Sequence, residues 1–314
     1  MMVGRHTPEG YGILRCCTWV LNSAIKTTFC ILHCSSYIVR MLQFAVPGCP
    51  LDTPSPGGTV EGLKYIHTLG CTAMELEWVQ RVPTNVEHLE KIGRTAKELD
   101  LTLTVHAPYY INLNSPEPEK LLASKKRILA ALTMAQIAGA RSVCVHAAFY
   151  LGMPPEKAFE NVRRAVNDVL KQKTKYFPDV NLALETMGKP SQFGTMEEVL
   201  KISKEFDIYP CIDPAHLHAR SNGKINTTKE WNDMFDLYED FLGKASLKQM
   251  HLHFSGIAYG AKGEKHHLPL QESDARWKDF VKILKKRKIG GICVCESPLM
   301  EVDTILLQKT YSEV

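Results

Sequence analysis

From residue 42 onward, short apolar or β-branched runs alternate with longer stretches in which apolar residues recur every three to four positions. Short runs of this kind predict buried β-strands, and the longer stretches predict amphipathic helices. The predicted strands are residues 42–46, 72–77, 102–106, 142–146, 181–186, 209–213, 247–253 and 291–296. The predicted helices lie near residues 58–69, 84–99, 117–138, 154–173, 194–205, 228–240, 274–287 and 301–312.

The order of these elements predicts an α/β fold, a single (β/α)₈ TIM barrel, because eight strand–helix units over about 270 residues suit that architecture. A doubly wound open sheet could also hold eight units. However, no GxGxxG or GxxxxGKS/T motif follows a predicted strand, so the nucleotide-binding versions of that fold lose their main support. We therefore expect one barrel domain over residues 41–314.

The first forty residues differ in character from the rest of the chain. Arg15 and Lys26 interrupt their apolar stretch, so a membrane-spanning helix is not expected. No small-residue cleavage site follows an apolar core, which also disfavours a signal peptide. Met41 stands directly before the first predicted strand. We therefore expect residues 1–40 to be an N-terminal extension that is poorly ordered or outside the functional domain.

Charge and cysteine content bear on three properties: nucleic-acid binding, thiolate metal sites and the redox compartment. The net charge is +4, but residues 1–40 supply +3 of it, so bulk charge does not indicate a nucleic-acid partner. Any phosphate-binding face must therefore be local. The ten cysteines include no CxxC pair, so a thiolate zinc knuckle is unsupported. Several of them lie in apolar strands as small buried residues, and a reducing, cytoplasmic setting fits best.

Six consecutive predicted strands, the third to the eighth, end with histidine or a carboxylate. In a barrel these ends meet at one rim, where the active site lies. Imidazole and carboxylate groups are ligands for Zn²⁺ and Mn²⁺, and their number predicts a cluster of two or three metals. A single strand-end histidine is usually structural, but six strands in succession are hard to explain as coincidence. The residues are His106, His146, Glu185, Asp213, His216, His218, His251, His253, Glu264, His266, His267 and Glu296.

In their order and spacing these residues resemble the endonuclease IV family (AP endonuclease family 2), within the xylose-isomerase-like barrel group. The resemblance extends over about residues 42–300. Each matching segment is short, but the series is specific. The segments are His106–Leu113, His146, Leu184–Thr186, Asp213–His216, Met250–His253, Glu264–His267 and Cys295–Pro298.

The resemblance implies three metal ions, which we expect to be Zn²⁺. The first would be held by His106, His146 and Glu185. The second would share Glu185 and add Asp213, His251 and Glu296. The third would use His216, Glu264 and His266, with His267 as the alternative to His266.

The chain departs from the family pattern in two places. Glu264 and Lys265 stand where the family usually has aspartate and arginine. The longer glutamate could shift or weaken the third site or favour Mn²⁺ there. After His251 the family commonly has Asn-Asp, whereas this chain has His253 and Phe254, so His253 could add a ligand or alter the surroundings of one. His218 is expected to be structural.

The resemblance also implies an activity: hydrolysis of the phosphodiester 5′ to an abasic site in double-stranded DNA, leaving a 3′-hydroxyl. Glu185 or Glu296 is expected to orient or deprotonate the attacking water. Tyr109 and Tyr110 match loop positions that contact DNA where the base is missing, and Arg81 resembles an inserted basic residue. We expect a monomer without membrane association.

Two other functions stay open. A metal-dependent sugar isomerase or epimerase on the same fold needs one or two metals and a few carboxylates, so a metal count separates it from the nuclease. A non-catalytic DNA-binding barrel would keep the fold and lose the chemistry, and Glu264 is the one ligand change that invites this view. Fold alone does not decide between them, because this barrel hosts many reactions.

The extension makes a prediction of its own. We expect the functional domain to begin at Met41 and residues 1–40 to be dispensable or artefactual, because the first predicted strand follows Met41 directly. Mass spectrometry of the native N-terminus checks this. A start at Met1, together with a leader that unfolds cooperatively with the barrel, would contradict it.

Overall fold

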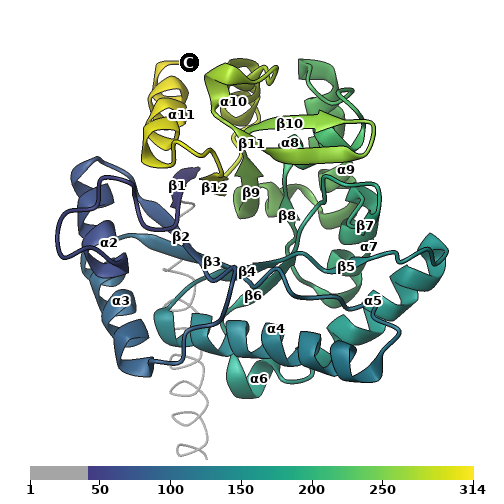
Figure 1. The fold of residues 1–314 in the computed structure, drawn as a ribbon. Helices are drawn as coiled ribbons and strands as arrows, with labels where there is room; N and C mark the ends of the chain where they lie inside the picture. Colours follow the sequence, from purple (N-terminus) through teal and green to yellow (C-terminus); the bar gives the residue numbers. More distant parts are fainter. Residues whose placement is uncertain (1–41) are drawn as a thin grey trace, which may run out of the picture. The chain divides into compact units, whose positions relative to one another are not determined.

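A computed structural model describes residues 42–314, in which eight parallel strands form a closed barrel (Figure 1). The extension proposed for residues 1–40 lies outside the described residues. The strands are β1 (Gln43–Pro47), β2 (Ala73–Glu77), β3 (Thr102–His106), β4 (Ser142–Val145), β6 (Asn181–Leu184), β8 (Cys211–Ile212), β9 (Met250–Phe254) and β12 (Gly291–Cys295). Their order is β6-β4-β3-β2-β1-β12-β9-β8, and a parallel bridge between Glu185 and Cys211 joins the two ends. The predicted TIM barrel is confirmed.

Helices follow the strands along the chain and surround the barrel (Figure 1). Local signals set their ends: the Asn85 side chain accepts from the backbone N–H of His88 at 3.0 Å, and Gly139 ends a helix with φ +70°. The main helices are α2 (Thr59–Thr68), α3 (Val86–Glu98), α4 (Pro118–Ala138), α5 (Pro155–Leu170), α7 (Met196–Phe206), α9 (Thr228–Leu242), α10 (Trp277–Lys286) and α11 (Glu301–Glu313). Within residues 42–314, no helix has the length and apolar character to cross a membrane.

The structure adds short elements where the sequence pattern gave only connections. The most important are helix α8 (Pro214–Arg220) and the hairpin of β10 (Gly256–Gly260) and β11 (Gly263–Leu268). Their segments are too short, or too rich in polar residues and glycine, to give a clear hydrophobic period. The remaining short elements are β5 (Ala148–Phe149), β7 (Gln192–Phe193), α6 (Lys173–Tyr176), η1 (Lys244–Lys248) and η2 (Leu270–Glu272).

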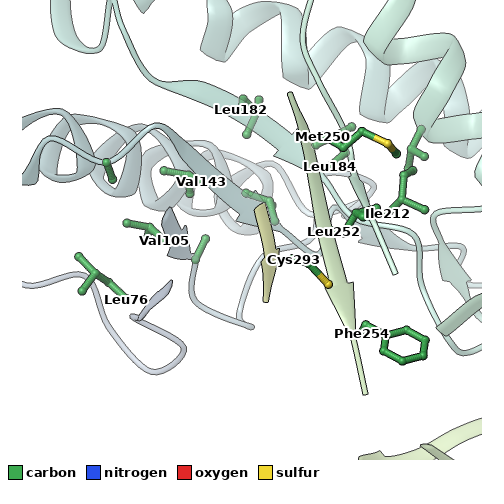
Figure 2. Packing of buried hydrophobic residues seen from close by; sticks show 14 of the residues in the cluster. Leu76, Val105, Val143, Leu182, Leu184, Ile212, Met250, Leu252, Phe254 and Cys293 are labelled. Atoms are coloured by element: carbon green, nitrogen blue, oxygen red, sulfur yellow. The ribbon is translucent and has the colours of Figure 1, made fainter. Parts of the chain in front are cut away.

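Side chains alternate in direction along each strand, so the core has two parts, one between strands and helices and one inside the barrel. Alternate residues pack outward against the helices in one large hydrophobic cluster, which includes Leu76, Val105, Val143, Leu182 and Leu252 (Figure 2). The other residues of each strand point into the barrel. There, the apolar groups are two small clusters: one of Ala45, Ala73, Ile292 and Val294, the other of Cys144, Ala183 and Cys211. The remaining interior positions are polar.

Close packing of α3 on α4 gives a stability prediction. Gly93 lies inside α3, and a Cβ atom there would stand 2.7 Å from the backbone oxygen of Ala138. Alanine would gain about 1 kcal/mol of helix propensity, but overpacking against backbone costs about 1–3 kcal/mol. We therefore expect Gly93→Ala to lower the urea midpoint of unfolding. Lys91→Ala, an exposed change in the same helix, should stay within about 0.5 kcal/mol. A more stable Gly93→Ala protein would contradict this packing.

Candidate metal centre

Glu185 is the centre of the polar rim. It follows β6, is fully buried, and both of its oxygens face imidazole nitrogens. Its Oε2 atom lies 2.9 Å from His146 Nε2 and 3.5 Å from His106 Nε2. His106 ends β3 and His146 follows β4, so the barrel brings these ligands together from three strands. The ligand atoms of His106, His146 and Glu185 lie within 4.8 Å of one another.

A second group shares Glu185 and adds Asp213, His216 and Glu296, again with ligand atoms within 4.8 Å of one another. Asp213 is the N-cap of α8, and its Oδ1 atom accepts from the backbone N–H of His216 at 3.0 Å. This cap fixes the direction of the carboxylate. Asp213 Oδ2 and Glu296 Oε2 are both buried, and within the described residues neither has a hydrogen-bond partner. Their neighbours are imidazole nitrogens, with His216 Nδ1 at 3.2 Å from Asp213 Oδ2 and His267 Nε2 at 3.9 Å from Glu296 Oε2.

A third group consists of His216, Glu264 and His267. Glu264 Oε2 lies 3.6 Å from His216 Nε2, and His267 Nδ1 lies 2.6 Å from the Ser255 hydroxyl. Because side chains alternate along β11, the ring of His266 belongs to the opposite face from His267 and is exposed. Of the two histidines that the sequence left open, the structure brings His267 to this group.

The histidines of β9 lie differently from the expected arrangement. His251, expected with the second metal, is not in the group of Glu185, Asp213 and Glu296. Its Nε2 atom instead lies 3.1 Å from Glu75 Oε2, and its Nδ1 atom lies 3.1 Å from the Ser142 hydroxyl. His253 is completely buried, and its Nδ1 atom donates a hydrogen bond to Glu185 Oε1 at 3.2 Å.

Glu75 is the residue that the sequence reasoning missed. It is a carboxylate in the middle of β2 and is fully buried inside the barrel. The sequence does carry a signal, since a carboxylate inside an apolar strand is costly to bury without a partner. Glu75 was passed over because it does not end its strand.

The hydrogen bonds of the ligand imidazoles test whether the rim suits metal ions. His106 Nδ1 lies 2.8 Å from the Ala107 carbonyl oxygen, and His216 Nδ1 lies 3.0 Å from the Thr186 carbonyl oxygen. A carbonyl only accepts, so each Nδ1 carries a proton. In a neutral ring the lone pair is then on Nε2, which faces Glu185 in one case and Glu264 in the other. Lone pairs aimed at carboxylates are suited to a shared cation, so the donor set fits.

The same groups determine the electrostatics of the site. Burial acts to raise the pKa of Glu185, but the imidazoles of His146 and His253 hold it well below the usual range. Burial likewise opposes ionisation of Glu296, yet His253 lowers its pKa to about 2. At Glu77 burial prevails and raises the pKa to about 8. Glu185 and Glu296 are thus held in the ionised form, which is the form that binds cations.

Of the expected DNA-contacting residues, Tyr109 contacts the rim, while Tyr110 and Arg81 lie in the neighbouring loops. Tyr109 and Tyr110 follow β3 and are 50% and 69% exposed, which is unusual for such large rings. The Tyr109 ring lies 5.2 Å from the rings of both His106 and His146. Arg81 lines a pocket of about 360 Å³ together with Arg127, whose Nη1 atom donates to the Tyr110 carbonyl oxygen at 3.0 Å. A basic and aromatic surface therefore adjoins the candidate metal centre.

His218 does not join the rim groups. It is buried within α8, and its Nε2 atom lies 3.2 Å from both carboxylate oxygens of Asp274. The ring of Tyr259 packs against it with 4.9 Å between the ring centroids. These contacts agree with the structural role expected for this histidine.

Comparisons with known proteins agree with the fold. Residues 63–309 match the family described as xylose isomerase-like TIM barrel. An uncharacterised protein of Methanocaldococcus jannaschii is 36% identical over 274 residues, which cover 87% of this chain and 98% of that protein. A probable endonuclease 4 of Shouchella clausii is 28% identical over 229 residues, which cover 67% of this chain and 76% of that protein.

Solved structures of two kinds of enzyme resemble this one. Endonuclease IV from Thermus thermophilus has a TM-score of 0.64 at 16% identity, with 86% of this chain and 98% of that chain covered. A D-tagatose 3-epimerase-like protein has the same TM-score and identity, with 87% and 96% covered. At this level of identity, the likeness concerns the fold alone.

Proposed function

The chain belongs to the xylose isomerase-like TIM barrel family, and from this premise we propose that it is a metal-dependent endonuclease of the endonuclease IV type. Its reaction is hydrolysis of the phosphodiester 5′ to abasic sites in double-stranded DNA. One observation carries the proposal: four imidazoles and four carboxylates form three overlapping groups at one rim of the barrel. A single tetrahedral ion needs only about four ligands. The groups contain His106, His146, His216, His267, Glu185, Asp213, Glu264 and Glu296.

The proposed ligand sets follow these groups. His106, His146 and Glu185 would hold the first ion, and the carboxylates of Glu185, Asp213 and Glu296 the second. His216, through Nε2, would hold the third together with Glu264 and His267. Bound Zn²⁺ at the three sites, with Mn²⁺ as the alternative beside Glu264, would neutralise phosphate charge and lower the pKa of a water.

The two expected catalytic carboxylates, Glu296 and Glu185, would have different roles. The side chain of Glu296 is 14% exposed and that of Glu185 is fully buried. Glu296 can therefore reach a water beside the substrate and orient it or accept its proton. Glu185, enclosed by imidazoles, would instead hold the ligands of neighbouring ions in fixed positions.

Recognition of an abasic site would use the exposed aromatic side chains. A nucleotide without its base turns out of the duplex at low cost, and protein side chains can fill the gap. Tyr109 and Tyr110 are exposed beside the rim, and Arg81 supplies positive charge next to them. Because the barrel domain carries little net charge, such a local surface would have to bind the DNA backbone. Action as a monomer in the cytoplasm belongs to the same proposal.

One observation favours a second candidate, a sugar epimerase. The four-residue group of Glu185, Asp213, His216 and Glu296 would by itself suffice for one cation, and a one-metal sugar enzyme needs no more. The likeness to an epimerase-like fold agrees equally well with this function. The histidines of β3 and β4 would then have no metal to bind, which is why the nuclease explains more of the rim.

The principal test is a nicking assay on a short duplex with one tetrahydrofuran abasic analogue. We expect incision 5′ to the lesion, an extendable 3′-hydroxyl, and loss of incision with a chelator. Glu296→Gln should lower kcat about a hundredfold or more, because it removes the carboxylate that orients the water.

The control is Glu313→Gln, an exposed change at the end of α11, which should cleave normally. Unchanged melting temperatures would show that both variants fold. A fully metal-loaded wild type that leaves the abasic duplex intact but epimerises a ketose would favour the second candidate. Near-normal cleavage by Glu296→Gln would remove this residue from catalysis.

Tyr109 and Tyr110 give a separate binding prediction. Replacing both with alanine should weaken binding to abasic duplex about tenfold or more, because each stacked ring is worth about 1–3 kcal/mol. Binding to intact duplex should change much less. Fluorescence anisotropy with Glu296→Gln as the background measures both affinities without cleavage. Tyr176→Ala, a partly exposed ring on α6, is the control. Equal losses on both duplexes would count against contact at the gap.

A further inference from the structure

Below the rim, the barrel interior holds a second set of metal-ligand atoms. Glu75 on β2 and His251 and His253 on β9 offer ligand atoms that lie within 4.8 Å of one another. All three residues are at most 1% exposed. In the sheet, β1 and β12 stand between β2 and β9, so the cluster spans the interior of the barrel. The three expected ligand sets do not include Glu75, and the sequence offers His253 only as an additional ligand at the rim.

The atoms of this cluster approach closely without hydrogen bonding. His253 Nε2 lies 2.9 Å from Glu75 Oε1, and His251 Nε2 lies 3.1 Å from Glu75 Oε2. Nevertheless, all four atoms are buried and without a hydrogen-bond partner in the described part of the chain. Each contact is an ion pair when the imidazole is protonated, and a bound metal ion would take the place of that proton. The ligand atoms of one carboxylate and two imidazoles therefore converge inside the barrel.

The opposite edge of each imidazole is, in contrast, engaged in a hydrogen bond. His253 Nδ1 donates to Glu185 Oε1 at 3.2 Å, and His251 Nδ1 bonds the Ser142 hydroxyl at 3.1 Å. The carboxylate partner of His253 places a proton on Nδ1 and leaves the lone pair of a neutral ring on Nε2, and His251 has the same tautomer when its Nδ1 donates to the hydroxyl. Histidines that bind metals commonly hold their other nitrogen in this way, by a carboxylate, carbonyl or hydroxyl group. His106 shows the same pattern at the rim, with Nδ1 on a carbonyl.

We propose that Glu75, His251 and His253 form a further, fully enclosed binding site for a divalent transition-metal ion such as Zn²⁺. Two imidazole nitrogens and the two oxygens of one carboxylate supply four ligand atoms, the number that a closed zinc site requires. The ion would connect β2 to β9 and fix the ring of His253, which contacts Glu185. The site lies beneath the proposed nuclease centre but does not depend on its activity.

The neighbouring thiols are the main competitor for such an ion. Cys144 and Cys211 form another possible group with Glu185 and His253. However, Cys144 already donates its thiol hydrogen to Glu185 Oε2 at 3.1 Å, and a thiol must lose that hydrogen to bind a metal. Glu75 needs no such change. The imidazole and carboxylate set is therefore the better site.

The test uses the whole metal-loaded chain and counts zinc by mass spectrometry after a short exposure to chelator. The rim is more accessible, since the His267 and Glu296 side chains are 28% and 14% exposed. We therefore expect the rim to lose its ions first, while one equivalent per chain remains until the barrel unfolds. Glu75→Gln should lose this equivalent, whereas Glu264→Gln, the same change at the rim, should retain it.

A second measurement uses the wild-type protein, so it stays informative even when the Glu75→Gln protein fails to fold. X-ray absorption of the retained zinc should show nitrogen and oxygen neighbours and no sulfur. Sulfur neighbours would assign the ion to Cys144 and Cys211 and overturn the proposal. So would a folded wild type that retains no zinc, or a Glu75→Gln protein that retains it. A chain that retains the ion yet never nicks abasic DNA would contradict only the proposed nuclease.

Discussion

The structure depends on how a barrel interior accommodates carboxylates that water does not reach. Glu75 and Glu185 are both fully buried, and an ionised carboxylate in such surroundings is stable only with strong compensation. Imidazoles projecting from other strands provide this compensation around Glu185. The alternation that sends apolar residues outward to the helices sends these polar groups inward, so one period of the sequence determines both the core and the site.

Much of the fold could be predicted because this period is strong. Each main strand and helix lies within a few residues of its expected position. Residues at the ends of strands were also predictable, since a barrel brings those ends to one rim. Thus the trio of His106, His146 and Glu185 meets as expected, and so do Asp213 and Glu296. Their roles as ligands follow from resemblance and chemistry and stay a prediction.

The remaining site residues could not be placed from the sequence, because their positions depend on strand register and hairpin geometry, which a periodic pattern does not determine. His251 and His253 both face the interior, and only the register with β12 decides how far each lies from the rim. The choice between His266 and His267 depended on a hairpin whose bulge lies between Ala258 and Tyr259. Glu75 was missed because its importance comes from residues on β9, which are distant in sequence and separated from it by two strands.

The hairpin of β10 and β11 forms a two-stranded sheet separate from the barrel sheet. Glu264 and His267 therefore reach the rim on this hairpin, while the other candidate ligands lie in or directly after the strands or, for His216, on the short helix α8. Changes in such a hairpin disturb the packed barrel little. Mutations in this hairpin could thus remove or create an ion-binding site while the barrel stays folded. The number of bound metals, and with it the reaction, could then change among relatives that share the same barrel.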